Sequence, residues 1–185
     1  MRKLEIVFTR SKKKVSFISK AVMWYMGTKY SHVARRAYIG KNMREMFYQS
    51  SERKVNYEYK DVFHKKHHIV AEYNIEIEDD LYGEVADMCL TQAGAVYATM
   101  QNLGIVWVDF CAKFGKKVKN PWKKGRNCSE LIYIAVLQKL IPNLDEKYNA
   151  DTIKPHQIEE IINTYFKKGK DGIYRLSLIK SQIID

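Results

Sequence analysis

The chain of 185 residues is 46% hydrophobic and 29% charged, a composition that excludes a disordered protein and is typical of a folded globular one. Its length suits a single domain over residues 1–185 with a core of its own. The formal net charge of +11 favours contact with something anionic, such as nucleic acid, a phospholipid surface or an acidic polymer. Surface lysines of small basic proteins often have no dedicated ligand, so charge alone does not identify a partner.

The N-terminal sequence and the cysteines indicate a reducing, cytoplasmic location. Residues 1–8 are too few and too charged for a signal peptide, and no apolar run approaches the ~20 residues of a membrane span. Cys89, Cys111 and Cys128 are odd in number and form no CxxC pair, so neither a disulfide framework nor a zinc ribbon is expected. Cys89 and Cys111 lie in apolar helical patterns and are predicted to be small core residues.

The first 80 residues predict mainly strands, because they are rich in Val, Ile and Tyr or alternate between apolar and polar positions. The expected strands cover residues 4–8, 31–39, 45–50, 54–59 and 66–77. A turn at residues 40–42 makes the second and third of them a hairpin. Before the hairpin, Ser16 is expected to cap a helix that ends at Gly27.

Beyond residue 78 the apolar pattern changes to the helical period of 3.6. Helices are expected over residues 79–92, 95–102, 105–114 and 128–140, and from Pro155 onward. A basic loop over residues 116–126 precedes Cys128, and residues 172–179 predict a last strand. Because strands come first and helices mostly follow, the sequence predicts an α+β fold.

Cys128 stands where a loop containing Gly125 changes into an apolar helix. A thiol there lies at the positive end of the helix dipole, near free backbone N–H groups, and both favour the thiolate. His32 opens a predicted strand, so a fold that brings the two together would provide a nucleophile and a base. Taken alone, such a cysteine is more often a packed thiol and such a histidine more often structural.

Further motifs occur in a fixed order along the chain. They comprise residues 6–10, residues 17–24, Ser31-His32-Val33, residues 47–51, residues 93–97 with 102–104, and Asn127-Cys128-Ser129-Glu130-Leu131. Together, over roughly residues 4–160, they resemble the circularly permuted NlpC-type, papain-like hydrolases of the YiiX and YebB kind. The compact, Lys- and Tyr-rich composition is similar to that of phage members of this family.

The resemblance implies a permuted papain-like fold, with an antiparallel sheet or small barrel packed against a helical half that carries the nucleophile. It implies Cys128 as nucleophile, His32 as base and Gln49 as the third polar residue. Glu or His is common at this third position, but an amide can also orient the imidazole ring. Glu45, four residues earlier on the same predicted strand face, is a second candidate, and Gln49 is otherwise a plain strand residue. Tyr97 matches an aromatic position that either donates to the oxyanion or packs in the core.

The function expected from this resemblance is a cysteine-dependent hydrolase that cleaves an amide or ester through an acyl-enzyme. Peptidase or amidase activity is favoured over lipid acyl hydrolase or acyltransferase activity, with no cofactor and a peptide or lipid-like substrate. The positive charge favours an anionic substrate. The alternative is a polyanion- or nucleic-acid-binding module on the same scaffold with an inactive site.

Two other groups of residues favour structural interpretations. His64, His67 and His68 lack neighbouring residues that would complete a metal's ligand set, so a polar loop leading into a strand is expected there. Aromatic residues at helical spacing after residue 105 are predicted to lie in the core. They are Trp107, Phe110 and Phe114. Trp122 is expected at the mouth of the cleft.

Overall fold

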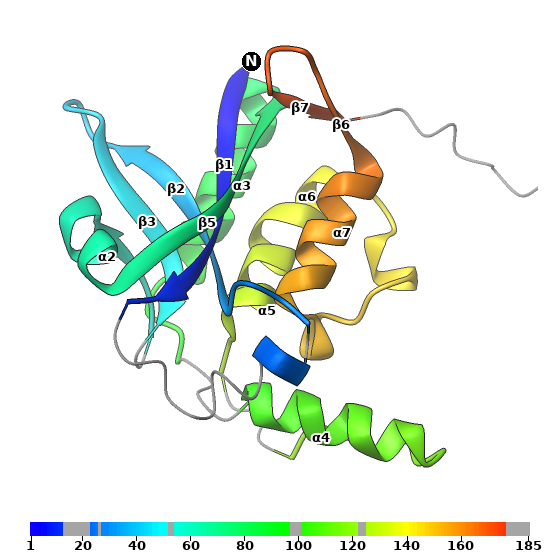
Figure 1. The fold of residues 1–185 in the computed structure, drawn as a ribbon. Coiled ribbons are helices and arrows are strands. Elements are labelled where there is room, and N and C mark those ends of the chain that lie inside the picture. Colours follow the sequence, from blue (N-terminus) through cyan, green and yellow to red (C-terminus); the bar gives the residue numbers. More distant parts are fainter. Residues whose placement is uncertain (13–22, 26, 52–53, 97–100, 122–124, 177–185) are drawn as a thin grey trace, which may run out of the picture.

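The computed structural model describes residues 1–185 except 13–22, 26, 52–53, 97–100, 122–124 and 177–185 (Figure 1). The described residues form an α+β fold in which six α-helices accompany an open, mostly antiparallel sheet of seven strands. The strands are β1 (Arg2–Ser11), β2 (His32–Ile39), β3 (Arg44–Ser51), β4 (Lys54–Tyr59), β5 (His67–Ile77), β6 (Phe166–Lys168) and β7 (Tyr174–Leu176). They lie in the order β4-β3-β2-β1-β5-β7-β6, and only β5 and β7 pair in parallel.

Most of the helices lie beyond residue 78, where the apolar pattern of the sequence changes to the helical period. They are α2 (Lys60–Lys66), α3 (Asp79–Thr91), α4 (Gln101–Lys113), α5 (Cys128–Ile132), α6 (Gln138–Leu140) and α7 (Pro155–Tyr165). A π-helical turn, Tyr133–Leu137, joins α5 to α6, so the helical segment that begins at Cys128 runs unbroken to Leu140. None of the described helices has the length and apolar character needed to cross a membrane.

The main core lies between one face of the sheet and the helices α3, α5, α6 and α7 (Figure 1). Strand residues on this face alternate with those on the other, as the period of two requires: Ile6 and Phe8 belong to the main core. Val7 instead joins a smaller cluster with Phe47 and Phe63 under α2, on the opposite face. Because β1 is buried on both faces, it fixes the position of its neighbour β2, which begins at His32.

Several sequence predictions are confirmed. The strands expected from residue 4 to residue 77 and the helices expected at residues 79–92, 128–140 and from Pro155 are present, with ends shifted by a few residues. Cys89 and Cys111 are buried core residues, as expected. Of the helix expected between Ser16 and Gly27, residues 23–25 are helical, and most of the rest lies outside the described residues.

Other predictions are wrong. Residues 60–66, expected as a polar loop, form α2, because Phe63 supplies a buried anchor that stacks on Phe47 at 3.8 Å. Residues 95–96 are not helical, since Val96 makes a β-bridge to Lys54, and α4 starts before the predicted residue 105. Strand β6 was not expected, and β7 covers only part of residues 172–179.

The aromatic residues of α4 also contradict the prediction of a core position. Trp107, Phe110 and Phe114 expose 47%, 51% and 67% of their surface. Helical spacing correctly placed the three on one face of a helix, but spacing does not determine whether that face turns inward or outward.

Candidate active site

Cys128 is the first residue of α5, and its neighbours fix the start of that helix. The side chain of Asn127 accepts a hydrogen bond from the Glu130 N–H at 2.7 Å, and the Glu130 carboxylate accepts one from the Asn127 N–H at 3.4 Å. This reciprocal capping box satisfies two of the amides that a helix start leaves without partners. Glu130 is fully buried and pairs with Arg126, so its charge is compensated.

The loop before Cys128 is attached to the sheet. The hydroxyl of Ser50 on β3 donates to the carbonyl of Arg126 at 2.7 Å, and the Arg126 N–H donates to the carbonyl of Val96 at 2.8 Å. These two bonds hold the residues before the capping box, and they therefore position the thiol of Cys128 against the strands.

His32 is the first residue of β2 and lies opposite Thr9 of β1 in the strand register. Two hydrogen bonds fix the residues directly before His32. The Ser31 N–H donates to the Thr9 carbonyl at 3.0 Å, and the hydroxyl of Tyr30 donates to Glu159 of α7. The ring of His32 is buried beside the Cys128 thiol, and each of these two groups shifts the pKa of the other. The structure thus brings together the two residues that the sequence singled out.

Gln49 of β3 is the third member of this group. His32 Nε2 donates to Gln49 Oε1 at 2.8 Å, and Gln49 Nε2 donates to Glu58 Oε2 at 2.8 Å. Because a carboxylate only accepts hydrogen bonds, Glu58 requires the amide nitrogen of Gln49 to face it. The carbonyl oxygen of Gln49 must then face His32, which keeps a proton on His32 Nε2 and leaves Nδ1 for Cys128.

Lys66 completes the relay at its far end. Its Nζ lies 2.7 Å from Glu58 Oε1, and this ion pair supplies a counter-charge for the buried carboxylate. Hydrogen bonds run from His32 through Gln49 and Glu58 to Lys66, and Cys128 lies beside His32 at the other end of the series. We call these five residues the polar relay.

The electrostatics favour an ion pair between Cys128 and His32. Burial disfavours the thiolate, but the charge of His32 and hydrogen bonds from His32, the Val33 backbone and Ser129 outweigh burial and lower the pKa of Cys128. Burial likewise disfavours the imidazolium, yet Cys128, with additions from Gln49 and Glu58, raises the pKa of His32. The two shifts have the directions required for a thiolate next to an imidazolium at neutral pH.

A second histidine covers His32 from β5. The ring of His67 stacks on that of His32 with a centroid distance of 5.0 Å, and it stacks on Phe63 at 4.7 Å. Burial, the charge of His32 and Lys66 together lower the pKa of His67 to about 3. At neutral pH His67 is therefore uncharged, and it shields the imidazolium of His32 without adding a second positive charge.

The remaining predicted residues have different positions. Glu45, the alternative to Gln49, pairs with Arg36 at 3.2 Å and Lys60 at 2.7 Å, and the bond to His32 comes from Gln49 instead. Tyr97 and Trp122 lie outside the described residues. Within the part of the chain that the structure describes, no three His, Cys, Asp or Glu side chains are grouped as ligands for a metal ion.

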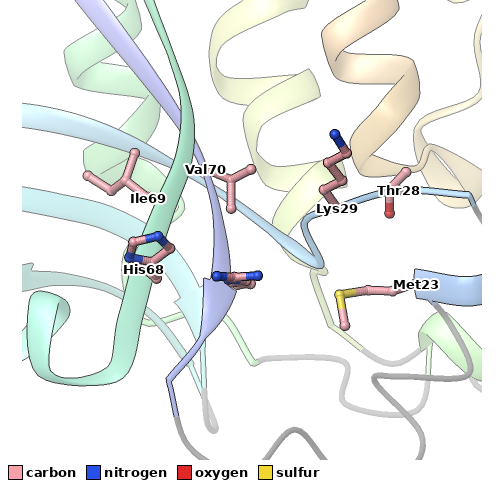
Figure 2. Close-up of a pocket in the computed structure, with 7 residues that line it drawn as sticks. Met23, Thr28, Lys29, His68, Ile69 and Val70 are labelled. Carbon is pink, nitrogen blue, oxygen red and sulfur yellow. The ribbon is translucent and has the colours of Figure 1, made fainter.

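A hollow of about 470 Å³ lies between strands β1 and β5 and residues 23–29 (Figure 2). Its seven lining residues are Arg10, Met23, Thr28, Lys29, His68, Ile69 and Val70. Three of them are basic or titratable and none is acidic. Arg10 directly follows Thr9, which pairs with His32, and His68 follows His67, which stacks on His32. Because consecutive strand residues point to opposite faces, Arg10 and His68 lie on the faces of β1 and β5 opposite to Thr9 and His67.

Sequence reasoning missed Glu58, Lys66 and His67. The first pairs with Gln49 because β3 and β4 form a hairpin in which Phe47 lies opposite Glu58 and Gln49 opposite Asn56. The alternation of β4 could have placed Glu58 on the face of Gln49, but only if the hairpin register had been known. The sequence predicts His67 in a polar loop leading into a strand, in preference to a metal site, and gives no sign of its contact with His32.

Comparison with known proteins adds no family assignment. No protein-family model matches the chain, and a search of curated proteins found no matching sequence.

Proposed function

We propose that the protein is a cysteine-dependent hydrolase that cleaves an amide or ester bond through an acyl-enzyme. The observation that carries this proposal is the buried pair of Cys128 and His32, whose charges act on each other, with Gln49 hydrogen-bonded to His32 Nε2. A nucleophile, a base and a group that orients the base are the three requirements of thiol catalysis.

The reaction follows from the positions of these groups. The Cys128 thiolate attacks the substrate carbonyl carbon, and His32 passes its proton to the leaving amine or alcohol as a thioester forms. His32 Nδ1 then takes a proton from water, which attacks the thioester and releases the acid and the thiolate. The first N–H groups of α5 have no intrahelical partner, so the Cys128 amide is suited to stabilise the oxyanion.

Within the α+β fold, we infer the permuted papain-like arrangement. In this arrangement the histidine strand precedes the cysteine helix along the chain, as β2 precedes α5 here. The helix packs on the face of the sheet that also bears Val33, directly after His32. The motifs around Cys128 and His32 that resemble the permuted NlpC-type hydrolases support the same inference.

The hollow lined by Arg10 and Lys29 favours a substrate with an anionic group. Arg10 and Lys29 line it together with apolar Ile69 and Val70, so it suits a carboxylate or phosphate attached to a short apolar portion. A peptide and a lipid both fit this description. The substrate class proposed is therefore an anionic acyl compound.

Activity measurements on wild type and Cys128→Ala test this function directly. Acyl-peptides, muropeptides and phospholipids would be screened, with the acyl-enzyme trapped for mass spectrometry. Cys111→Ala is the matched control, because Cys111 is also a buried cysteine but lies on α4. We expect activity in wild type and in the control and none in Cys128→Ala; activity that survives in Cys128→Ala would exclude Cys128 as nucleophile.

A further inference from the structure

Helix α4 presents aromatic side chains to solvent. Trp107 and Phe110 belong to this helix, and Phe114 directly follows it. All three side chains are about half exposed or more. The ring centroids are 6.1 Å apart between Trp107 and Phe110 and 5.0 Å apart between Phe110 and Phe114. The spacing of three and four residues places them on one face. Ile105, on the opposite face of the helix, is buried, and so is Cys111. We call Trp107, Phe110 and Phe114 the aromatic ridge.

The ridge is next to a strongly basic segment. Lys113 ends α4, and Lys116, Lys117 and Lys119 follow it, all exposed. No acidic residue occurs in the sequence between Asp109 and Glu130. Asp109 itself faces Lys154, with which it forms an ion pair, so it does not neutralise these lysines. An apolar ridge thus adjoins an uncompensated positive charge.

The ridge is also connected, through residues 23–25, to the hollow lined by Arg10 and Lys29. Figure 1 shows α4 below α5 and next to the helical turn at residues 23–25. The ring of Tyr25 in that turn lies 5.5 Å from Lys113 Nζ, and burial together with the nearby Asp109 carboxylate raises the pKa of Tyr25. Trp24 exposes 85% of its surface, and Met23 lines the hollow. A surface that contacts the ridge therefore also lies close to the entrance of the hollow.

We propose that the aromatic ridge and the four lysines dock the protein on an anionic phospholipid surface. Trp and Phe side chains bury favourably at the boundary between headgroups and acyl chains, whereas lysines attract anionic headgroups. A basic helix whose outward face is apolar has the charge and shape for this surface. This docking does not require that Cys128 be catalytic.

Cosedimentation with vesicles tests the proposal. The protein would be mixed with vesicles of phosphatidylcholine alone and of phosphatidylcholine with phosphatidylglycerol. We expect binding to the anionic vesicles at least about tenfold stronger than to the neutral ones, weakened by salt. Equal binding to both vesicles, or none to either, would overturn the proposal.

Three variants separate the contributions. The ridge variant replaces Trp107, Phe110 and Phe114 with Ser, and the lysine variant replaces Lys113, Lys116, Lys117 and Lys119 with Gln. The control replaces exposed apolar residues on other elements, Met43, Tyr59 and Leu90, with Ser. We expect both test variants to lose about tenfold or more in vesicle binding and the control to match wild type.

Two further results would assign the surface differently. If the ridge variant bound vesicles like wild type, the ridge would not be the docking element. If wild type were a dimer by sedimentation and the ridge variant a monomer, the ridge would cover a second copy of the chain. The lysine variant keeps the test decisive if the ridge variant fails to fold, because its substitutions are confined to exposed polar side chains.

Discussion

Gln49 donates a hydrogen bond from its amide nitrogen to the Glu58 carboxylate across the β3–β4 hairpin at 2.8 Å. This bond determines which ring nitrogen of His32 is available to Cys128. It turns the carbonyl of Gln49 toward His32 and so leaves His32 Nδ1 for Cys128. The orientation of an uncharged side chain is thus controlled by a charge one strand away.

Replacing Gln49 with Ala removes the group that fixes the ring of His32. We expect kcat/KM to fall about tenfold to a hundredfold, because a buried group left without its hydrogen bond costs roughly 1–3 kcal/mol. Asn56→Ala is the matched control, since Asn56 lies opposite Gln49 in the strand register and carries the same amide without contacting His32. Equal losses in the two variants would show that the effect is structural.

Glu58→Gln keeps the shape of the side chain and removes its charge. Cys128 is the main cause that raises the pKa of His32 against burial, and Glu58 adds to it. We therefore expect the alkaline limb of the pH–rate profile to move to lower pH, as the imidazolium loses its proton earlier. Glu45→Gln is the control, because Glu45 is also ion-paired but has Arg36 and Lys60 as partners. An alkaline limb that is the same in both variants would remove Glu58 from the relay.

His67 predicts a specific dependence of stability on pH. Its pKa is lowered from 6.5 to about 3 in the folded protein, first by burial. Below pH 6.5 the unfolded chain binds a proton at this position that the folded chain does not, so the free energy of unfolding falls as pH falls from about 6.5 to about 3. Urea unfolding across this range measures the effect.

In His67→Gln that part of the pH dependence should disappear. His68→Gln replaces the exposed histidine one residue along β5 and should leave the dependence as in wild type. If His67→Gln and wild type lose stability equally between pH 6.5 and 3, His67 is not held neutral by the fold.

The N-cap of α5 should contribute more to the free energy of unfolding than an exposed cap elsewhere in the chain. Asn127→Ala removes the bond to the Glu130 N–H and leaves a buried amide without a partner, so we expect a loss of about 1–2 kcal/mol in unfolding free energy. Asn149→Ala removes a similar bond, from the Asp151 N–H, at an exposed turn and should cost less. Thermal unfolding compares them, and a larger loss in Asn149→Ala would contradict the account.

Much of the fold follows from local patterns. The strand at residues 32–39 and the helical segment from Cys128 were predictable because alternation, periodicity and a capping sequence are local signals. Helix α2 was not predictable from local patterns, because its formation depends on the contact between Phe63 and Phe47, which lies on another element. The outward direction of the aromatic ridge was missed for a related reason: periodicity places residues on a common face without giving its surroundings.

The candidate site was predictable only as separate parts. Cys128 could be recognised from its place at a helix start, and His32 and Gln49 from motifs that resemble a known family. Their partners depend on register: Glu58 meets Gln49 through the pairing of β3 with β4, and His67 meets His32 through the pairing of β1 with both β2 and β5. Register is a property of the assembled sheet, which one strand does not reveal.

The proposed reaction requires that His32 hold Cys128 as a thiolate at neutral pH. Titration of thiolate ultraviolet absorbance in wild type, Cys128→Ser and His32→Ala measures this most directly. We predict one thiol in wild type that ionises well below the ordinary range, that is absent in Cys128→Ser and that titrates at higher pH in His32→Ala. A wild-type curve identical to that of Cys128→Ser throughout the neutral range would contradict the account.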